Sequence, residues 1–220
     1  MKKTYTVRNY ITEKAGNLYA LCIERCLALR SNRGAFSFIV QLPLTSSSRM
    51  EVTRDVLRSH SAFFYVATFG DRPGKLFEGM EHCRASVFNS IGTPSSSNPS
   101  LLFSTKYHRW PSAAREQLLS TLHFVPVTEI KTIFPDRFPK LPSKTSSGLF
   151  KKIGQPEMKP LGLGFSGHAT DHFIFYQEST EYWVKATVGL PYYRCNGKAG
   201  APPHGRYLYF HDAITANGVL

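Results

Sequence analysis

Long apolar runs are missing from this chain. None reaches the roughly 18 residues that a membrane-spanning helix needs. The first residues, MKKTYTVRNYITEKAG, are basic but include no apolar segment of the kind found in a signal peptide. A membrane-surface role would need an amphipathic basic helix, and no segment has that pattern. We therefore expect a cytoplasmic protein without a membrane partner.

Cysteine is also scarce, with four residues: Cys22, Cys26, Cys83 and Cys195. No two of them form a C-x-x-C pair, so a zinc ribbon is not expected. Cys22 and Cys26 fall on the apolar face of a predicted helix, and Cys83 falls in a predicted strand. We expect reduced thiols packed in the core, as is typical of cytoplasmic proteins.

The common catalytic motifs are absent. The sequence has no Gly-x-Ser-x-Gly elbow, Walker loop or His-Glu-x-x-His, and its carboxylates form no convincing acid/base pair. GLGFSG (162–167) matches G-x-G-x-x-G, but Lys159-Pro160 precedes it where a strand should be, so we interpret it as a turn. His168, Asp171 and His172 have no further ligands to complete a metal site. The chain carries little chemistry of its own.

Acidic residues are few, and this leaves a large charge excess. Twenty-seven Lys and Arg stand against 15 Asp and Glu, a net charge of +12. Such an excess favours an anionic partner, most often a nucleic acid. The 220 residues allow one domain or two small ones, and an apolar content of 42% is enough for a core.

The pattern up to about residue 127 indicates an α/β fold. Asn17 can cap a helix to about Ser31, whose apolar face would include Leu18, Leu21, Cys22, Cys26 and Leu29. AFSFIVQL (35–42) is almost continuously apolar, as in a strand buried on both faces. A helix over 49–60, strands over 61–68 and 82–91, a strand from Leu101 and a helix over 111–122 follow.

Prolines become frequent around 127–140, and we place a domain boundary between residues 127 and 128. Helical pattern is scarce beyond it. DHFIFYQ, EYWVKATV and RYLYFHD are aromatic strand candidates separated by turn residues. The expected second domain, 128–220, is therefore mostly β.

Three segments mix cations with aromatic residues: STKYHRWPSAAR, LFKKIG and EYWVKATVGLPYYRCNGK. Cations neutralise phosphates and aromatic rings stack on bases, so the mixture is typical of nucleic-acid binding. A charged surface beside a buried aromatic core would look similar. The candidate contacts in these segments are Lys106, His108, Arg109, Lys151, Lys152, Lys185 and Arg194.

The connection FGDRPGKLFEG (69–79) is unusually long and rich for a hairpin. It holds cations, glycines and Phe77, which has no obvious core to enter. Gly74 and Gly79 would permit close approach of the backbone to a ligand.

NLYALCIERCLALRSNRGAFSFIVQLPLTSS, FGDRPGKLFEGMEHCRASVF and STKYHRW together resemble the gamma-class N6-adenine DNA methyltransferases of restriction–modification systems. The resemblance is specific over about 17–127 and looser through EYWVKATVGLPYY and RYLYFHD, which look like the target-recognition region. It implies a C-terminal half of a Rossmann-like sheet with an antiparallel hairpin.

The resemblance assigns a role to Phe77, which matches the aromatic residue that stacks on the flipped adenine in this family. An enzyme that acts on a base must extract it from the duplex, and the exposed base needs a stacking partner. Arg72 and Lys75 beside Phe77 are candidate contacts to backbone phosphates. Phe77 could instead fold back beneath its own hairpin.

Two motifs of the family are missing. Neither its Gly-rich S-adenosylmethionine loop nor its Asn/Asp-Pro-Pro-aromatic motif precedes Asn17, and APPHG (201–205) does not replace the latter. The resemblance therefore implies the DNA-binding and base-flipping portion of a methyltransferase. S-adenosylmethionine would bind the complete enzyme and not this chain alone, and an upstream polypeptide or missing N-terminal half would supply the cofactor site. The alternatives are a decayed fragment or a non-enzymatic nucleic-acid-binding module.

Overall fold

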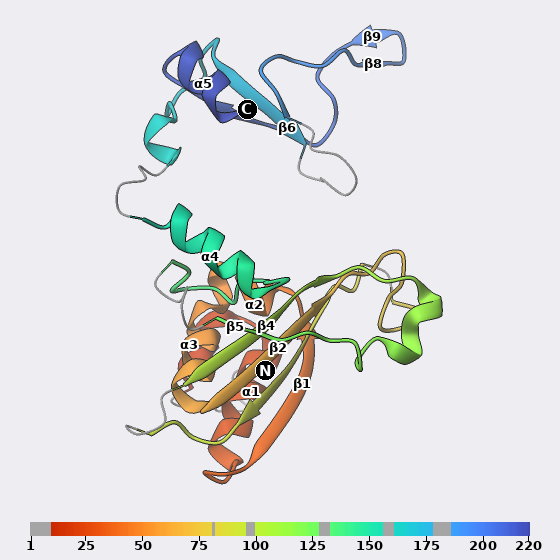
Figure 1. The fold of residues 1–220 in the computed structure, drawn as a ribbon. Helices are drawn as coiled ribbons and strands as arrows, with labels where there is room; N and C mark the ends of the chain where they lie inside the picture. The colour runs from red at the N-terminus through yellow and green to blue at the C-terminus, as the bar shows by residue number, and fades with distance from the viewer. Residues whose placement is uncertain (1–9, 81, 96–99, 128–132, 156–160, 178–185) are drawn as a thin grey trace, which may run out of the picture. The chain divides into compact units, whose positions relative to one another are not determined.

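The computed structural model describes residues 10–80, 82–95, 100–127, 133–155, 161–177 and 186–220 (Figure 1). The chain forms two compact units, Met1–Gln155 and Pro156–Leu220. The division falls later than the boundary expected after residue 127, because the following segment packs on the first unit. Phe138 is buried beside Phe64, and Leu141 is buried beside Val125 and Val127.

The first unit is built on a five-stranded mixed sheet within the described residues, in the order β1-β3-β2-β4-β5. Its strands are β1 (Ala35–Gln41), β2 (Phe63–Phe69), β3 (Ala85–Ile91), β4 (Leu101–His108) and β5 (Val125–Pro126). β3 is antiparallel to both β1 and β2, whereas β2 and β4 are parallel. The fold class is therefore mixed α/β, and the β2–β3 hairpin predicted from the sequence is confirmed.

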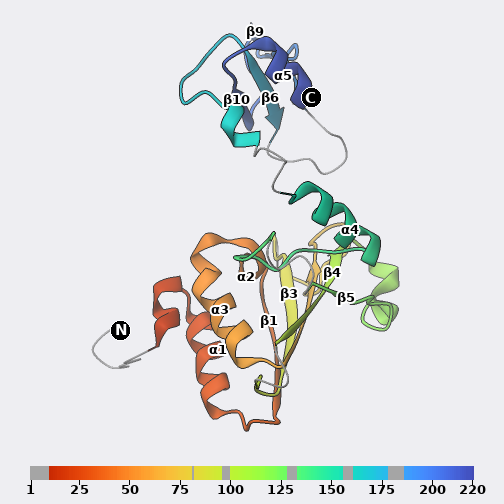
Figure 2. The same cartoon turned by 60° about the vertical axis from the view of Figure 1, so that its left-hand side comes forward.

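One face of this sheet is covered by helices α1 (Leu18–Leu29) and α3 (Glu51–His60), as Figure 2 shows. Short α2 (Pro43–Ser46) follows β1 directly. The predicted cap of α1 is confirmed, since the Asn17 side chain accepts a hydrogen bond of 3.1 Å from the Tyr19 backbone N–H. The core under the helices contains Ile23, Leu27, Val40, Leu44, Val56, Leu57, Phe64, Val66 and Phe88.

A smaller cluster lies on the opposite face of the sheet, where Trp110 and Leu118 pack against Ala67 and Phe69. The helix predicted over 111–122 is wrong in type, because the chain forms a 3₁₀ helix over Ser112–Gln117 followed by turns.

β1 and α1 bury less than the sequence predicts. β1 is an edge strand with Ile39 52% exposed, so the expectation of burial on both faces is wrong. The predicted apolar face of α1 is wrong too, since Leu18 and Leu29 are 75% and 68% exposed. The core face of α1 is instead Ala20, Ile23 and Leu27. α1 is apolar on both sides, which is typical of a helix covered on both sides.

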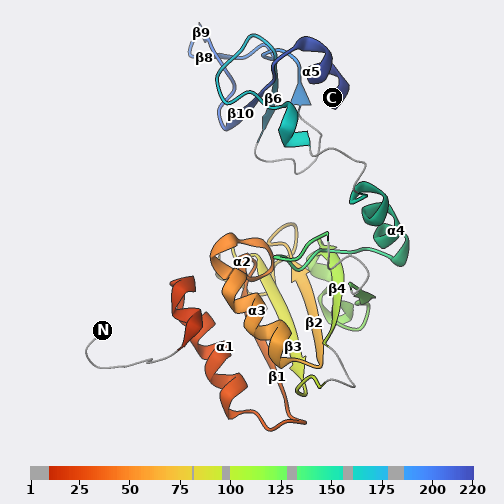
Figure 3. The same cartoon turned by 90° about the vertical axis from the view of Figure 1, so that its left-hand side faces the viewer.

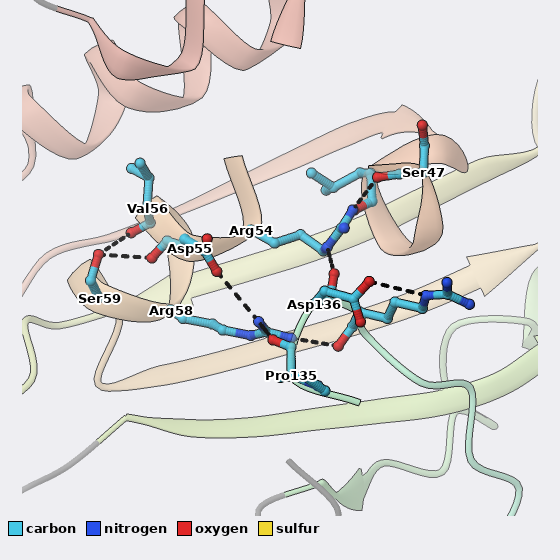
Figure 4. Close-up of polar contacts among 10 residues, drawn as sticks. Ser47, Arg54, Asp55, Val56, Arg58, Ser59, Pro135 and Asp136 are labelled. Carbon is cyan, nitrogen blue, oxygen red and sulfur yellow. Dashed lines mark hydrogen bonds and ion pairs between the residues drawn. The ribbon is translucent and has the colours of Figure 1, made fainter. Parts of the chain in front are cut away.

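Two arginines of α3 hold the segment after residue 132 against the rest of the first unit (Figure 4). Arg54 is fully buried and donates hydrogen bonds to the carbonyls of Leu44, Ser47 and Asp136. Arg58 donates to the carbonyls of Pro135 and Arg137 and lies over the ring of Phe138, 5.0 Å from its centroid. Desolvation lowers the pKa of both guanidinium groups, but each donates to backbone carbonyls. Helix α4 (Lys144–Ile153), which the sequence pattern did not predict, follows this segment.

The second unit is small and antiparallel (Figure 3). β10 (Gly205–Tyr209) pairs with β6 (Phe173–Gln177), which pairs with β7 (Ala186–Thr187); β8 (Arg194–Cys195) and β9 (Lys198–Ala199) form a hairpin. α5 (Ala213–Val219) packs Ala216 against Ile174 and Phe210. The strands predicted in DHFIFYQ and RYLYFHD are confirmed, whereas most of EYWVKATV lies outside the described residues. The first three residues of GLGFSG end a short 3₁₀ helix over Leu161–Gly164, and its Phe165 forms a bridge with Phe210.

The described parts of the chain contain neither a membrane-spanning helix nor a cluster of metal-ligating side chains. No helix there has the length and apolar character needed to span a membrane. No group of three or more His, Cys, Asp or Glu side chains that could hold a metal ion occurs there either. All four cysteines are free, but Cys22 and Cys195 are exposed, so the expectation of a core position was wrong for Cys22.

Candidate nucleic-acid interface

The long β2–β3 connection lies at one end of the sheet. β1, β2 and β4 run in the same direction, and their last residues are neighbours: Phe69 pairs with both Ala85 and His108, and Ala85 also pairs with Gln41. Residues 70–84 and the basic segment after β4 therefore meet beyond the carboxyl ends of three strands. Open α/β sheets place their ligands at this end.

Arg115 holds the first part of this connection against the 3₁₀ helix. Its guanidinium donates to the carbonyls of Leu76 at 3.0 Å and Lys75 at 2.7 Å, and it stacks over Trp110 at 5.3 Å from the ring centroid. Glu78 lies 3.6 Å from the same guanidinium. The loop is therefore positioned by Arg115, the last residue of the basic segment STKYHRWPSAAR.

Gly74 serves this packing rather than a ligand. Its backbone N–H donates to the Trp110 carbonyl at 2.7 Å, and a Cβ on Gly74 would lie 2.6 Å from that oxygen. The ligand approach expected for Gly74 is therefore corrected to a close approach to Trp110. Gly79 has φ of +75° and open space around its Cα, which suits the turn that presents Phe77.

Phe77 is 39% exposed and belongs to none of the hydrophobic core clusters of the described residues. Its ring lines a cavity of about 330 Å³ beside the end of β1, together with Ile39, Gln41 and Met80. The side chain neither packs fully beneath the hairpin nor extends freely into solvent. A ring at the wall of an open cavity can stack on a planar ligand.

A second cavity of about 520 Å³ shares Gln41, Met80 and Cys83 with the first. Its wall also includes His82, Arg84, Ser46 and Ser47. The Nε of Arg84 donates to the Asp71 carboxylate at 3.3 Å, and Nδ1 of His82 lies 3.7 Å from the same carboxylate. Burial acts to raise the pKa of Asp71, but hydrogen bonds from the backbone and Arg84, with the charges of Arg84 and Arg72, outweigh it and lower that pKa.

Some of the other predicted DNA-contacting residues are exposed in the structure, and others are buried. Arg72, Lys106 and Arg109 are exposed at the same end of the sheet, and Lys75 is half-buried. Trp110 and His108 are buried, so their rings are not available to DNA. The His108 ring stacks on Phe69 with centroids 5.4 Å apart. We therefore leave His108 out of the contact set.

His108 should make the stability of the chain depend on pH. Desolvation, with a smaller effect of Lys106, lowers the pKa of His108 from its ordinary value of 6.5. The unfolded state then binds more protons below about pH 6.5, so the free energy of unfolding is largest above that pH and falls as the pH drops. Urea unfolding at pH 7.5 and 5.5 should show a smaller drop for His108→Phe than for the natural chain. His211→Gln, an exposed control, should leave the drop unchanged; an equal drop in His108→Phe would contradict this assignment.

The remaining predicted contacts lie elsewhere. Lys151 and Lys152 are exposed on α4, and Arg194 is exposed in the β8–β9 hairpin, where its Nε donates to the Gly197 carbonyl at 2.9 Å. Lys185 lies outside the described residues. Residues 1–155 carry 22 Lys and Arg against 10 Asp and Glu, whereas residues 156–220 carry five of each. The whole charge excess therefore belongs to the first unit.

Sequence reasoning missed Asp71, His82 and Arg84 as members of this site. All three flank Phe77 in sequence, so their place in the connection was the available signal. Arg115 belongs to the basic segment STKYHRWPSAAR, but its contacts to Lys75 and Leu76 cross about 40 residues and were not predicted.

The comparison with solved structures gives weak likenesses. No protein-family model matches the chain, and no curated protein matches it. Among solved structures, the chain is similar to one described as a cryo-EM structure of a DrdV–DNA complex, with a TM-score of 0.39 and 15% identity over 50% of this chain. The match covers 12% of that chain. At this TM-score the likeness assigns neither a fold family nor a function.

Proposed function

We propose that this chain is the DNA-binding and base-flipping portion of a site-specific adenine DNA methyltransferase, in which another polypeptide segment supplies the S-adenosylmethionine site and the catalytic motif. The observation that carries this proposal is Phe77. Its ring is partly exposed at the wall of a cavity, at the carboxyl ends of β1, β2 and β4. Basic side chains from the β2–β3 connection and β4 surround that end of the sheet.

The arrangement of the strands supports the same proposal. β3 lies antiparallel between β1 and β2, which fits the antiparallel hairpin that the resemblance to gamma-class methyltransferases implies. Phe77 lies in that hairpin, at the position where the resemblance places the base-stacking aromatic residue. A flipped adenine needs a stacking surface and neighbouring cations for its backbone, and both are present here.

The proposed partner segment would cover the open side of the first unit. Among the described residues no strand pairs with the outer edge of β1. Leu18 and Leu29 are exposed on one face of α1. A strand added to β1 would satisfy its unpaired backbone groups, and a neighbouring helix would bury the apolar side chains. The cofactor-bearing half of the enzyme is the occupant that we propose.

The double change Leu18→Lys and Leu29→Lys should separate this partner role from stability. Because both side chains are exposed, we expect the melting temperature of the isolated chain to change by less than about 2 °C. Co-purification with the upstream polypeptide, and any methylation that the pair performs, should be lost. The isolated natural chain should bind no S-adenosylmethionine in a calorimetric titration; binding by the chain alone would contradict the proposed division.

Replacing Phe77 tests the base-stacking role directly. Base–aromatic stacking is worth about 1–3 kcal/mol. Phe77→Ala should therefore weaken binding to a duplex that holds an adenine opposite an abasic site by about that amount, with no change for the fully paired duplex. Phe77→Trp should keep most of the affinity because a flat aromatic face remains. Fluorescence anisotropy with both duplexes provides the measurement, and 2-aminopurine in place of the adenine reports on stacking.

Thermal melts of the same variants provide the control. Phe77→Ala should change the melting temperature little, and Leu119→Ala, an exposed apolar control, should change neither property. A large fall in melting temperature with an unchanged 2-aminopurine signal would show that Phe77 is a structural residue. DNA binding without any preference for the abasic duplex would favour a plain nucleic-acid-binding module.

A further inference from the structure

The second cavity adjoins the Phe77 cavity and differs from it in chemistry. The Phe77 cavity has mostly apolar walls, including Ile39, Val40 and Met80, whereas the second has His82, Arg84 and the two hydroxyl residues Ser46 and Ser47. The two cavities share Gln41, Met80 and Cys83 as walls. An aromatic wall in one cavity and a cationic wall in its neighbour match a nucleotide, in which a flat base lies next to a charged phosphate.

We propose that Arg84, assisted by His82, binds the DNA backbone phosphate next to the base that stacks on Phe77. This inference rests on the proposed function, and it assigns a phosphate site to residues outside the basic clusters recognised in the sequence. The ligand class is a phosphodiester, which a guanidinium binds through charge-assisted hydrogen bonds.

Arg84 is held in place for this role. Its Nε donates to Asp71, whose side chain is only 8% exposed, while the Arg84 side chain itself is 52% exposed. The Asp71 carboxylate, whose pKa is lowered in part by its hydrogen bond with Arg84, accepts the bond that orients the Arg84 guanidinium. A cation that is already oriented loses less side-chain entropy when it binds a phosphate.

The backbone fixes the position of Arg84 and His82 relative to β1. The Leu42 N–H donates to the Arg84 carbonyl at 3.0 Å, which continues the β1–β3 ladder directly into the cavity wall. His82 has φ of +54°, an uncommon backbone conformation for a residue other than glycine. This conformation places an exposed imidazole within 3.7 Å of Asp71. Arg84 and His82 therefore lie on the fixed end of the connection rather than at its tip.

A neutral linkage in the DNA tests the contact without changing the protein. The probe is a duplex with an adenine opposite an abasic site and one methylphosphonate at the phosphate on the 5′ or the 3′ side of that adenine. If Arg84 binds this phosphate, one of the two positions should weaken binding by the natural chain about tenfold, since a hydrogen bond to a charged group is lost. A methylphosphonate six nucleotides away should have little effect.

The variant Arg84→Met completes the cycle, with Arg33→Met as an exposed control at the opposite end of β1. Arg84→Met should lose about the same tenfold on ordinary DNA and should no longer respond to the methylphosphonate. Arg84→Lys, which keeps a charge beside Asp71, should keep the melting temperature and recover part of the affinity.

The outcomes separate the two proposals. Two results would overturn the phosphate contact even if Phe77→Ala behaves as expected. One is that neither methylphosphonate position weakens binding relative to the unmodified duplex. The other is that the affinity losses from Arg84→Met and from the methylphosphonate are additive. Arg84-dependent binding of millimolar deoxyadenosine monophosphate, with no effect on DNA, would overturn it in favour of a free nucleotide. If neither Phe77 nor Arg84 matters for the abasic duplex, the proposed function fails as well.

Discussion

Arg54→Met is expected to lower the free energy of unfolding of the chain by about 3–5 kcal/mol. Three carbonyls, of Leu44, Ser47 and Asp136, accept hydrogen bonds from the Arg54 guanidinium, which is fully buried. Each buried acceptor left without a donor costs about 1–3 kcal/mol. Removal of the buried Arg54 charge offsets part of that cost. Nη2 of Arg54 is buried without a hydrogen-bond partner within the described residues, so the guanidinium is itself incompletely compensated for its loss of water.

Calorimetry or circular dichroism would measure this effect as a fall in melting temperature of roughly 10 °C. Arg54 also joins α3 to the segment after residue 132, so limited proteolysis should cut near Asp136 sooner in the variant. Arg33→Met is the matched control, since Arg33 is exposed. A change of less than about 2 °C for Arg54→Met would mean that the carbonyls find other donors and that the tether matters little.

DNA affinity should fall about 500-fold between 50 and 200 mM monovalent salt. The first unit carries all of the +12 net charge. If about five phosphates are neutralised, the logarithm of the binding constant should fall with the logarithm of the salt concentration with a slope of about −4 to −5 on duplex DNA. Lys106→Ala and Arg109→Ala should each reduce that slope by about one unit if each binds one phosphate. Anisotropy titrations over this salt range provide the slopes.

The net-neutral second unit supplies the control for this experiment. Arg194→Ala should change the slope by less than about half a unit, because the Nε of Arg194 is already bonded to Gly197 within its hairpin. An affinity that does not depend on salt would contradict the electrostatic basis of binding. A full unit lost on Arg194→Ala would instead place phosphates on the second unit.

Local signals in the sequence predicted most of the elements of the first unit. The Asn17 cap, the helix over 49–60 and the paired strands around the long connection depend on periodicity and turn residues within a few positions, and all three are found. α1 and β1 were placed but their burial was wrong. Apolar residues such as Leu18 and Ile39 predict that something covers them, but not whether the same chain does so.

The candidate site was predicted less completely for a similar reason. Phe77 stood out because an apolar ring in a polar loop breaks the local pattern. His108 looked like a surface cation, and its burial depends on the stacking with Phe69 from another strand. Arg54 and Arg58 fitted the polar face of a helix, and the carbonyls of Pro135, Asp136 and Arg137 that they bind lie about 80 residues further along the chain. Contacts across such separations leave no periodic trace in sequence.

The open edge of β1 and the bare apolar side of α1 also bear on how the cell handles this polypeptide. Among the described residues no strand pairs with the outer edge of β1, and Leu18 and Leu29 of α1 are exposed. Such surfaces favour self-association and attract chaperones and proteases. The steady-state abundance of the chain should therefore follow the supply of whatever covers that side, and molecules made in excess should be removed. Production in equal amounts, from adjacent and co-translated reading frames, is the arrangement that such a surface favours.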